Sequence, residues 1–196
     1  MNNMKKSRLT PEMINVLTKS HFAYLCTTDQ KNQPHITPMF YVFDEKTKNV
    51  FITASSNSKK MHNIRDNPKI SLTIDIRDEL NPFNNQGVMV QGEAVVEKNE
   101  QGTGEKVLHV AMYLEGNPFV EKTEAGTKDE KLYQASKAFA EKYPVLQETK
   151  SPMSGEVKKF SEKLIRIVPK KMVFWRGPNF TTVNFDKQRI SNSPTM

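Results

Sequence analysis

The alternation of apolar and polar residues predicts several short strands. Between Lys69 and Arg77, apolar side chains occupy every second position and polar ones lie between them. This period of two is typical of an antiparallel strand with one buried face. Aromatic and apolar runs bounded by turn residues predict further strands over 22–28, 35–43, 50–54 and 88–97, the last with a bulge or bend at Gly92.

Two short helices are predicted among these strands. Thr10 can cap a helix that has Pro11 in its first turn and ends near Ser20. A second helix should begin at about Ser58 and stop before Pro68, because the residue before a proline disfavours helical backbone.

The second half of the chain has a different pattern. Apolar residues recur at helical spacing between Gly104 and about Tyr143, which predicts a helical insertion. Two closing strands, 164–168 and 171–176, should meet at a hinge at Pro169. The tail after Gly177 lacks periodicity, and we expect it to be loosely ordered.

Consecutive short strands joined by tight turns predict a mainly β protein with added α elements. We expect an antiparallel, six- to seven-stranded split β-barrel with peripheral helices. No repeat or linker divides the chain, so residues 1–196 should form a single domain that contains the insertion at about 104–143.

Composition narrows the classes of function. The 196 residues carry a formal charge of +7 and one cysteine, which excludes an internal disulfide and a multi-cysteine metal site. No apolar run approaches the roughly 18–20 residues of a membrane span, and the basic N-terminus lacks the apolar core of a signal peptide. We therefore expect a cytoplasmic protein without membrane contact. The lysines are scattered among acids, so nucleic-acid binding is a weaker hypothesis.

The segment around Ser58-Lys59-Lys60 could bind an anion. It follows a predicted buried strand and opens a helix, whose first N–H groups lack intrahelical partners and favour negative charge. Hydroxyls at Ser55 and Ser56 add donors. The alternative is that both lysines are ordinary solvated residues at a helix start.

The order of these motifs resembles the FMN-binding split barrel of the pyridoxamine 5'-phosphate oxidase-like superfamily. The resemblance covers roughly the first half of the chain and a C-terminal piece, without the insertion. It is carried by these segments: Phe22-Ala23-Tyr24-Leu25-Cys26-Thr27-Thr28, Gln33-Pro34-His35-Ile36-Thr37-Pro38-Met39-Phe40-Tyr41, Phe51-Ile52-Thr53, Ser58-Lys59-Lys60, Asn63-Ile64-Arg65-Asp66-Asn67-Pro68, Ile70-Ser71-Leu72, Val88-Met89-Val90-Gln91-Gly92-Glu93-Ala94 and Ile167-Val168-Pro169-Lys170-Lys171-Met172-Val173-Phe174-Trp175.

The resemblance implies a homodimer with FMN, or in some branches a deazaflavin, in clefts between subunits. The residues that it places at the cofactor fall into four groups. They are Ile36, Thr37, Pro38, Met39 and Tyr41 along the ring; Ile52 and Thr53 at the ring or ribityl chain; Ser58, Lys59 and Lys60 at the phosphate; and Gln86, Val88 and Trp175 from the partner subunit.

The departures from the family pattern concern the substrate. True pyridoxamine phosphate oxidases carry a basic residue at each end of the ring strand, where this chain has Ile36 and Tyr41. The ring-contacting glutamine of the family falls on Gly87, one place after Gln86. We therefore expect a broader relative that does not oxidise pyridoxamine phosphate.

The leading hypothesis is a flavin-dependent oxidoreductase that acts on an unassigned small molecule, because in such enzymes the cofactor carries the redox chemistry. The alternative is a non-catalytic flavin or haem binder or sensor on the same barrel, with haem the less favoured ligand. No residue is assigned a catalytic role. Tyr41 and Trp175 could serve in packing as well as in ligand contact.

Overall fold

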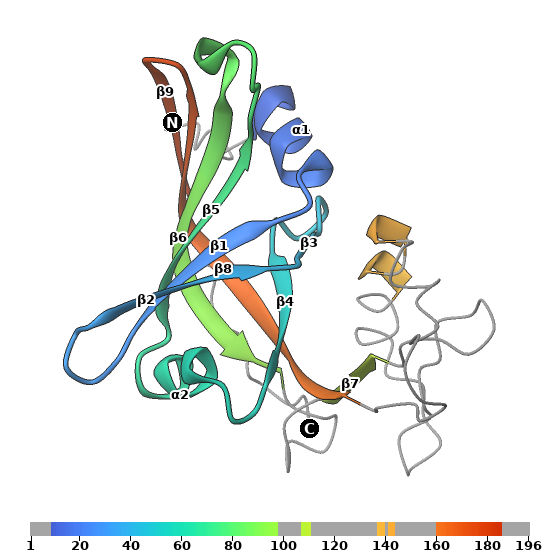
Figure 1. Cartoon of the computed structure of the whole chain (residues 1–196), viewed down its shortest axis with the longest axis vertical. Coiled ribbons are helices and arrows are strands. Elements are labelled where there is room, and N and C mark those ends of the chain that lie inside the picture. The colour runs from blue at the N-terminus through green and yellow to red at the C-terminus, as the bar shows by residue number, and fades with distance from the viewer. Residues whose placement is uncertain (1–8, 98–106, 111–136, 140, 144–159, 186–196) are drawn as a thin grey trace, which may run out of the picture.

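The computed structural model describes residues 9–97, 107–110, 137–139, 141–143 and 160–185. These residues form a curled antiparallel sheet with two α-helices packed on it (Figure 1). The elements in chain order are α1 (Pro11–Lys19), β1 (Ala23–Thr28), β2 (Pro34–Met39), β3 (Val42–Phe43), β4 (Val50–Ser55), α2 (Lys59–Asp66), β5 (Lys69–Ile76), the 3-10 turn η1 (Pro82–Asn84), β6 (Gln86–Val96), β7 (Val107–Val110), β8 (Phe160–Arg176) and β9 (Asn179–Asn184).

The sheet has the strand order β2-β1-β5-β6-β8-β4-β3, and β7 and β9 also pair with β8. The expected mainly β, antiparallel split barrel with few helices is confirmed. Both helices form where the local sequence predicts them, and the Thr10 hydroxyl accepts from the Met13 N–H at 3.3 Å as the cap of α1. α1 packs against β3, β5 and β6, and α2 packs against β1 and β4.

The core lies on the inner face of the curl and consists of apolar residues from almost every element. The alternation in β5 works as predicted, since Ile70, Leu72 and Ile74 are buried. The bulge predicted at Gly92 is also present, because the register between β6 and β8 shifts between Gln91 and Gly92. A side chain at residue 92 would place its Cβ 2.2 Å from the carbonyl oxygen of Val168, so only glycine fits there.

The bulge explains why the predicted hinge at Pro169 is wrong. The strands expected at 164–168 and 171–176 form one continuous strand, β8. Pro169 lies opposite Gly92 at the register shift, where the missing N–H of proline breaks no regular ladder bond. The carbonyl of the next residue, Lys170, accepts a hydrogen bond from the Phe185 N–H at 2.9 Å.

Three other expectations are corrected. The strand predicted over 35–43 is interrupted at Phe40 and Tyr41, which separate β2 from β3. Residues 107–110, expected to be helical, form β7, because the start of β8 extends past the end of β6 and offers a free backbone edge. The tail expected to be loose after Gly177 contains β9, which pairs with β8 through residue 184.

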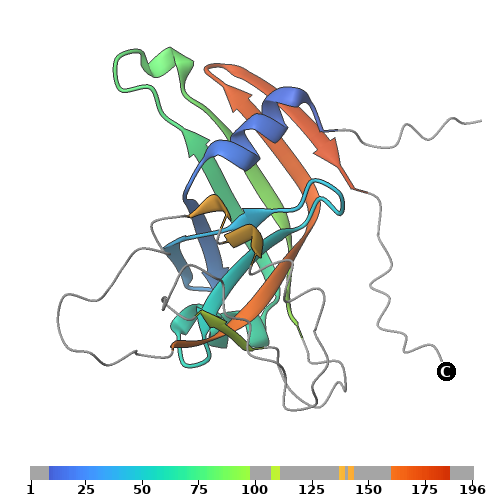
Figure 2. The ribbon, with the colours of Figure 1, turned by 90° about the vertical axis from the view of Figure 1, so that its right-hand side faces the viewer.

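The helix expected up to Tyr143 is partly present. Residues 137–139, 141 and 142 are helical and lead to Tyr143 (Figure 2). The rest of the predicted insertion, and the tail beyond residue 185, lie outside the described residues. No helix in the described part of the chain is long and apolar enough to cross a membrane.

Candidate functional site

The start of α2 is the best-defined polar site that the sequence predicts. β4 ends at Ser55, and a turn follows in which both the N–H and the hydroxyl of Ser58 donate to the Ser55 carbonyl, at 3.0 and 2.8 Å. Ser58 is the N-cap residue, but its side chain does not cap the helix, because the hydroxyl is directed back to Ser55. The N–H groups of the first turn therefore receive no cap from Ser58.

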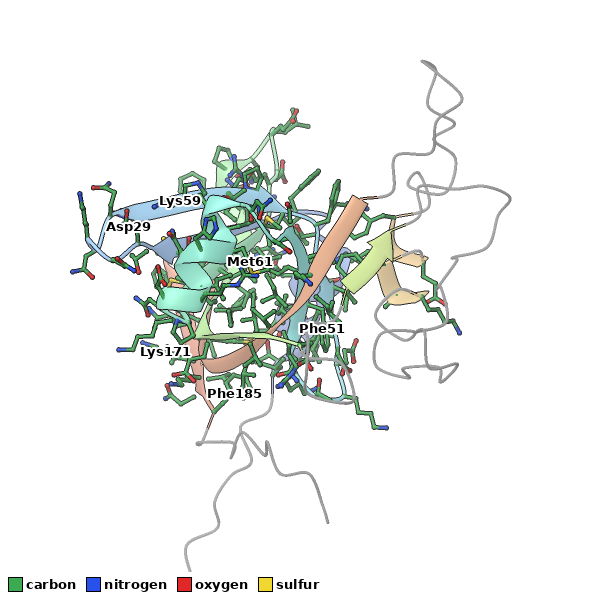
Figure 3. The ribbon with its side chains drawn as sticks, turned by 90° about the horizontal axis from the view of Figure 1, so that it is seen from below. Asp29, Phe51, Lys59, Met61, Lys171 and Phe185 are labelled. Carbon is green, nitrogen blue, oxygen red and sulfur yellow. The ribbon has the colours of Figure 1, made fainter. Side chains whose placement is uncertain are left out.

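Lys59 and Lys60 stand on this first turn, which contains no acidic residue. The Lys59 ammonium lies 3.2 Å from a carboxylate oxygen of Asp29, on the turn after β1 (Figure 3). Lys59 is exposed and Lys60 is half-buried. The Asp29 carboxylate therefore neutralises part of the charge that Lys59 brings to the helix N-terminus, while Lys60 adds a second cation on the same turn.

Asp29 is held firmly in place by its own turn. One of its carboxylate oxygens accepts from the N–H groups of Lys31 and Gln33, both at 2.9 Å. These bonds, first that from Gln33, and the bond from Lys59 lower the pKa of Asp29 below its ordinary value. The pairing of Asp29 with Lys59 spans 30 positions and therefore has no local signal in the sequence.

Polar side chains fix α2 against the β1–β2 hairpin. The Asn63 amide donates to the Thr27 hydroxyl at 3.0 Å in the interior, and the Asn67 amide donates to the Thr28 hydroxyl at 3.0 Å. Met61 lies on the face of α2 that is turned away from solvent and is fully buried in the core (Figure 3). The start of α2 is therefore rigidly positioned beside the end of β1.

The strand predicted to lie along a ring, β2, is an edge strand of the sheet. In the described part of the chain it pairs only with β1, so its other backbone edge is available for hydrogen bonds. Ile36 and Pro38 face outward, and Ile36 is 66% exposed. Thr37 and Met39 are half-buried on the opposite face, where the Thr37 hydroxyl lies 3.3 Å from Nδ1 of His35.

Three of the proposed cofactor residues have their side chains in the core. Ile52, Val88 and Tyr41 are all fully buried. The Tyr41 hydroxyl lies 2.9 and 3.0 Å from the carbonyl oxygens of Leu17 and Ser20 at the end of α1, and it can donate its one hydrogen to either of them. Any ligand contact from these three residues would therefore come from their backbone atoms.

Gln86 and Trp175 lie far from α2 along the sheet. Trp175 on β8 pairs with Gly87 on β6, and Gln86 pairs with Arg176. Ser55, the last residue of β4 before α2, pairs with Glu162 of β8, whereas Trp175 lies thirteen residues further along β8, roughly 43 Å at about 3.3 Å per residue. One protomer does not bring Trp175 together with Lys59, whereas Thr53 on β4 leads directly into the turn before α2.

The outward face of the sheet is rich in apolar side chains. One row of paired residues crosses it and consists of Pro38, Tyr24, Thr73, Met89, Val173 and Thr182. On one side of this row, Phe22 and Phe40 are exposed and pack with ring centroids 5.1 Å apart. The described residues contain no cluster of histidine, cysteine and acidic side chains able to hold a metal ion.

Comparisons with known proteins agree with this architecture. The sequence model described as pyridoxamine 5'-phosphate oxidase matches residues 9–117, more than half of the 196 residues. A search of curated proteins found no match.

Solved structures share the fold at low sequence identity. A haem binding protein from Mycobacterium smegmatis gives a TM-score of 0.60 at 11% identity, over 90% of this chain and only 59% of that chain. A conserved hypothetical protein from Mycobacterium tuberculosis gives 0.55 at 19% identity, over 90% of this chain and 91% of that chain. A protein from Mesorhizobium loti described as FAD-binding gives 0.53 at 14% identity, over 85% and 92% of the two chains.

Proposed function

Because this chain belongs to the pyridoxamine 5'-phosphate oxidase family, we propose that it binds FMN and is a flavin-dependent oxidoreductase. The observation that carries the proposal is the placement of Ser58, Lys59 and Lys60 at the start of α2. This segment lies inside the region matched by the family model. It also directly follows β4, as the resemblance requires.

The groups at this end of α2 suit a phosphate dianion. The Met61 N–H already donates to the Ser58 carbonyl at 3.0 Å, so the first-turn donors left for a ligand are the N–H groups of Lys59 and Lys60, where the macrodipole favours a negative group. Lys59 and Lys60 supply full charges on the same turn. Charge-assisted hydrogen bonds of this kind are about twice as strong as neutral ones.

The ring of the cofactor would lie along β2. Successive residues of an antiparallel strand direct their N–H and C=O groups to opposite edges, so only one alternate set, Ile36 with Pro38 or Thr37 with Met39, faces the free edge, and Pro38 can only accept. The bound flavin would supply the redox chemistry, and the protein would position it and limit water access. The exposed apolar Ile36 favours a substrate without a phosphate group at this end of the strand.

A second copy of the chain would complete the site. Gln86 and Trp175 are too far along the sheet to reach the start of α2 within one protomer. The apolar outward face, with Phe22, Tyr24 and Phe40 exposed, could be covered by that second copy. A homodimer would therefore bury this face and bring residues from two subunits to each flavin.

A double substitution at the phosphate end tests the proposal. Lys59→Ala with Lys60→Ala should weaken FMN binding about 100-fold, because each charge-assisted bond contributes about 1.5–3 kcal/mol and tenfold corresponds to about 1.4 kcal/mol. Flavin fluorescence titration measures the affinity. Riboflavin, which lacks the phosphate, should bind both proteins equally.

The matched control replaces two exposed lysines elsewhere, Lys46→Ala with Lys69→Ala, and should leave FMN affinity unchanged. Equal FMN affinity in the wild type and the Lys59/Lys60 variant would contradict the phosphate assignment. Mass spectrometry of the cofactor that copurifies would separate FMN from a deazaflavin.

The second candidate is a non-catalytic flavin or haem binder. It is favoured by the similarity in fold to the M. smegmatis protein, which is described as haem binding. The absorbance spectrum of the purified protein distinguishes the two. Flavin bands that bleach with a nicotinamide cofactor support the oxidoreductase, whereas a Soret band supports the haem binder.

A further inference from the structure

The ammonium group of Lys142 is buried without a hydrogen-bond partner. Its Nζ atom has no partner among the described residues, although its three N–H groups are strong donors. Nζ lies 3.5 Å from the centroid of the Tyr41 ring and 5.7 Å from that of Tyr143. Burial lowers the pKa of Lys142 to about 7.

The neighbouring residue, Tyr143, attaches this segment to the point where β2 ends. The Tyr143 hydroxyl accepts from the Tyr41 N–H at 3.0 Å. It also lies 2.8 Å from each of the carbonyl oxygens of Tyr41 and His21, to which it can donate its one hydrogen. The hydroxyl thus takes the place of a strand partner at the break between β2 and β3, where the backbone would otherwise be unsatisfied.

An apolar cluster completes this attachment. Phe139 and Tyr143 pack against Val42, with Phe51 at the margin. We call residues 137–139 and 141–143, with these contacts, the clamp. The hydrogen bonds of the Tyr143 hydroxyl and this apolar packing hold the clamp on the sheet.

No acid near Lys142 compensates its charge in the described part of the chain. The adjoining carboxylate, Glu141, is directed to Lys137 at 3.8 Å. The other titratable groups around Lys142 are the hydroxyls of Tyr41 and Tyr143, and the exposed ring of His21, which lies 6.1 Å from the ring of Tyr143. The Tyr41 ring face attracts the cation but cannot accept all three of its hydrogens.

We infer that the clamp is pH-sensitive and that protonation of Lys142 weakens its hold on the backbone at Tyr41. When the clamp is released, water solvates the charged ammonium of Lys142. When the clamp is docked, the ammonium is buried, so the docked state is more stable with Lys142 neutral. The clamp therefore tightens as pH rises through neutrality. On the proposed function, this would link pH to the end of the strand that lies along the flavin ring.

Hydrogen exchange of the Tyr41 amide tests the inference on the protein without added ligand. After correction for the intrinsic exchange rate, protection of this amide should be about tenfold greater at pH 8 than at pH 6 in the wild type. In Lys142→Met it should be high and equal at both pH values. Lys137→Met, which removes an exposed lysine from the same segment, should behave like the wild type.

His21 is the competing titratable group, so His21→Gln should retain the tenfold difference. Loss of the difference in His21→Gln, its persistence in Lys142→Met, or its absence in the wild type would each overturn the inference. If Lys142→Met does not fold, a pH titration of the ε-carbon chemical shift of Lys142 in the wild type tests the inference. A titration midpoint near neutral pH supports the pH-sensitive clamp, and a midpoint above pH 9 overturns it. None of these results depends on whether FMN binds.

Discussion

Lys59 and Lys142 are cations in opposite surroundings. Lys59 is exposed at the start of α2 and has a carboxylate partner, Asp29, at 3.2 Å. The ammonium group of Lys142 is buried over the Tyr41 ring, and its Nζ has no hydrogen-bond partner among the described residues. The difference shows that solvent and counter-charge decide what a lysine does: Lys59 can exchange its carboxylate partner for a ligand, whereas burial lowers the pKa of Lys142 to about 7.

The strongest disruption of the buried region should come from Tyr143→Phe. The variant leaves without a partner the Tyr41 N–H and whichever carbonyl, of Tyr41 or His21, receives the hydroxyl hydrogen, and one buried unsatisfied group costs about 1–3 kcal/mol. We expect a loss of about 2–3 kcal/mol in the free energy of unfolding, measured with urea. A loss below about 0.5 kcal/mol would show that water replaces the hydroxyl.

The pH dependence of stability should come next in size. The pKa of Lys142 is lowered from 10.5 to about 7 in the folded protein, so the unfolded chain binds more protons between those values. Stability should therefore rise with pH from about 7 upward, with no further loss from this group below about pH 7. Lys142→Met should be more stable at pH 7, by about 1–2 kcal/mol, since it removes an unsatisfied buried group.

The rise in the free energy of unfolding with pH that Lys142 contributes should be absent from Lys142→Met and present in Lys137→Met. Chemical unfolding at pH 7, 8 and 9 measures it. Equal slopes in the wild type and Lys142→Met would assign the pH dependence to another group and remove the contrast between the two lysines.

The smallest effect on stability should come from Asp29→Asn. The Lys59–Asp29 pair is at the surface, where such pairs contribute about 0–1 kcal/mol. FMN affinity should rise several-fold, because a carboxylate no longer competes with the phosphate for Lys59. Titration with FMN, and with riboflavin as the control, measures the change. Weaker FMN binding in Asp29→Asn would show that the carboxylate supports the ligand.

The sequence predicts elements whose signal is local. The Thr10 cap, the alternation in β5 and the glycine bulge at Gly92 each depend on neighbours within a few positions, and all three are present. The start of α2 belongs to the same class. These patterns are sufficient to place Ser58, Lys59 and Lys60 at a helix N-terminus.

The errors arise where tertiary pairing overrides the local pattern. Residues 107–110 and 179–184 have weak strand signals, but the long strand β8 offers each of them a free edge. The contact between Tyr41 and Tyr143 spans 102 positions, and that between Asp29 and Lys59 spans 30. No periodicity within a short window could have predicted either contact.

The ring of Trp175 lies directly on the backbone of Gly87, where a Cβ at residue 87 would be 2.6 Å from its indole atoms. Trp175 is the only tryptophan in the chain and is half-buried on the outward face of the sheet. The fluorescence of the protein therefore comes mainly from one indole ring, whose position is fixed by its packing on Gly87. Its emission wavelength would register the loss of water whenever another surface covers that face.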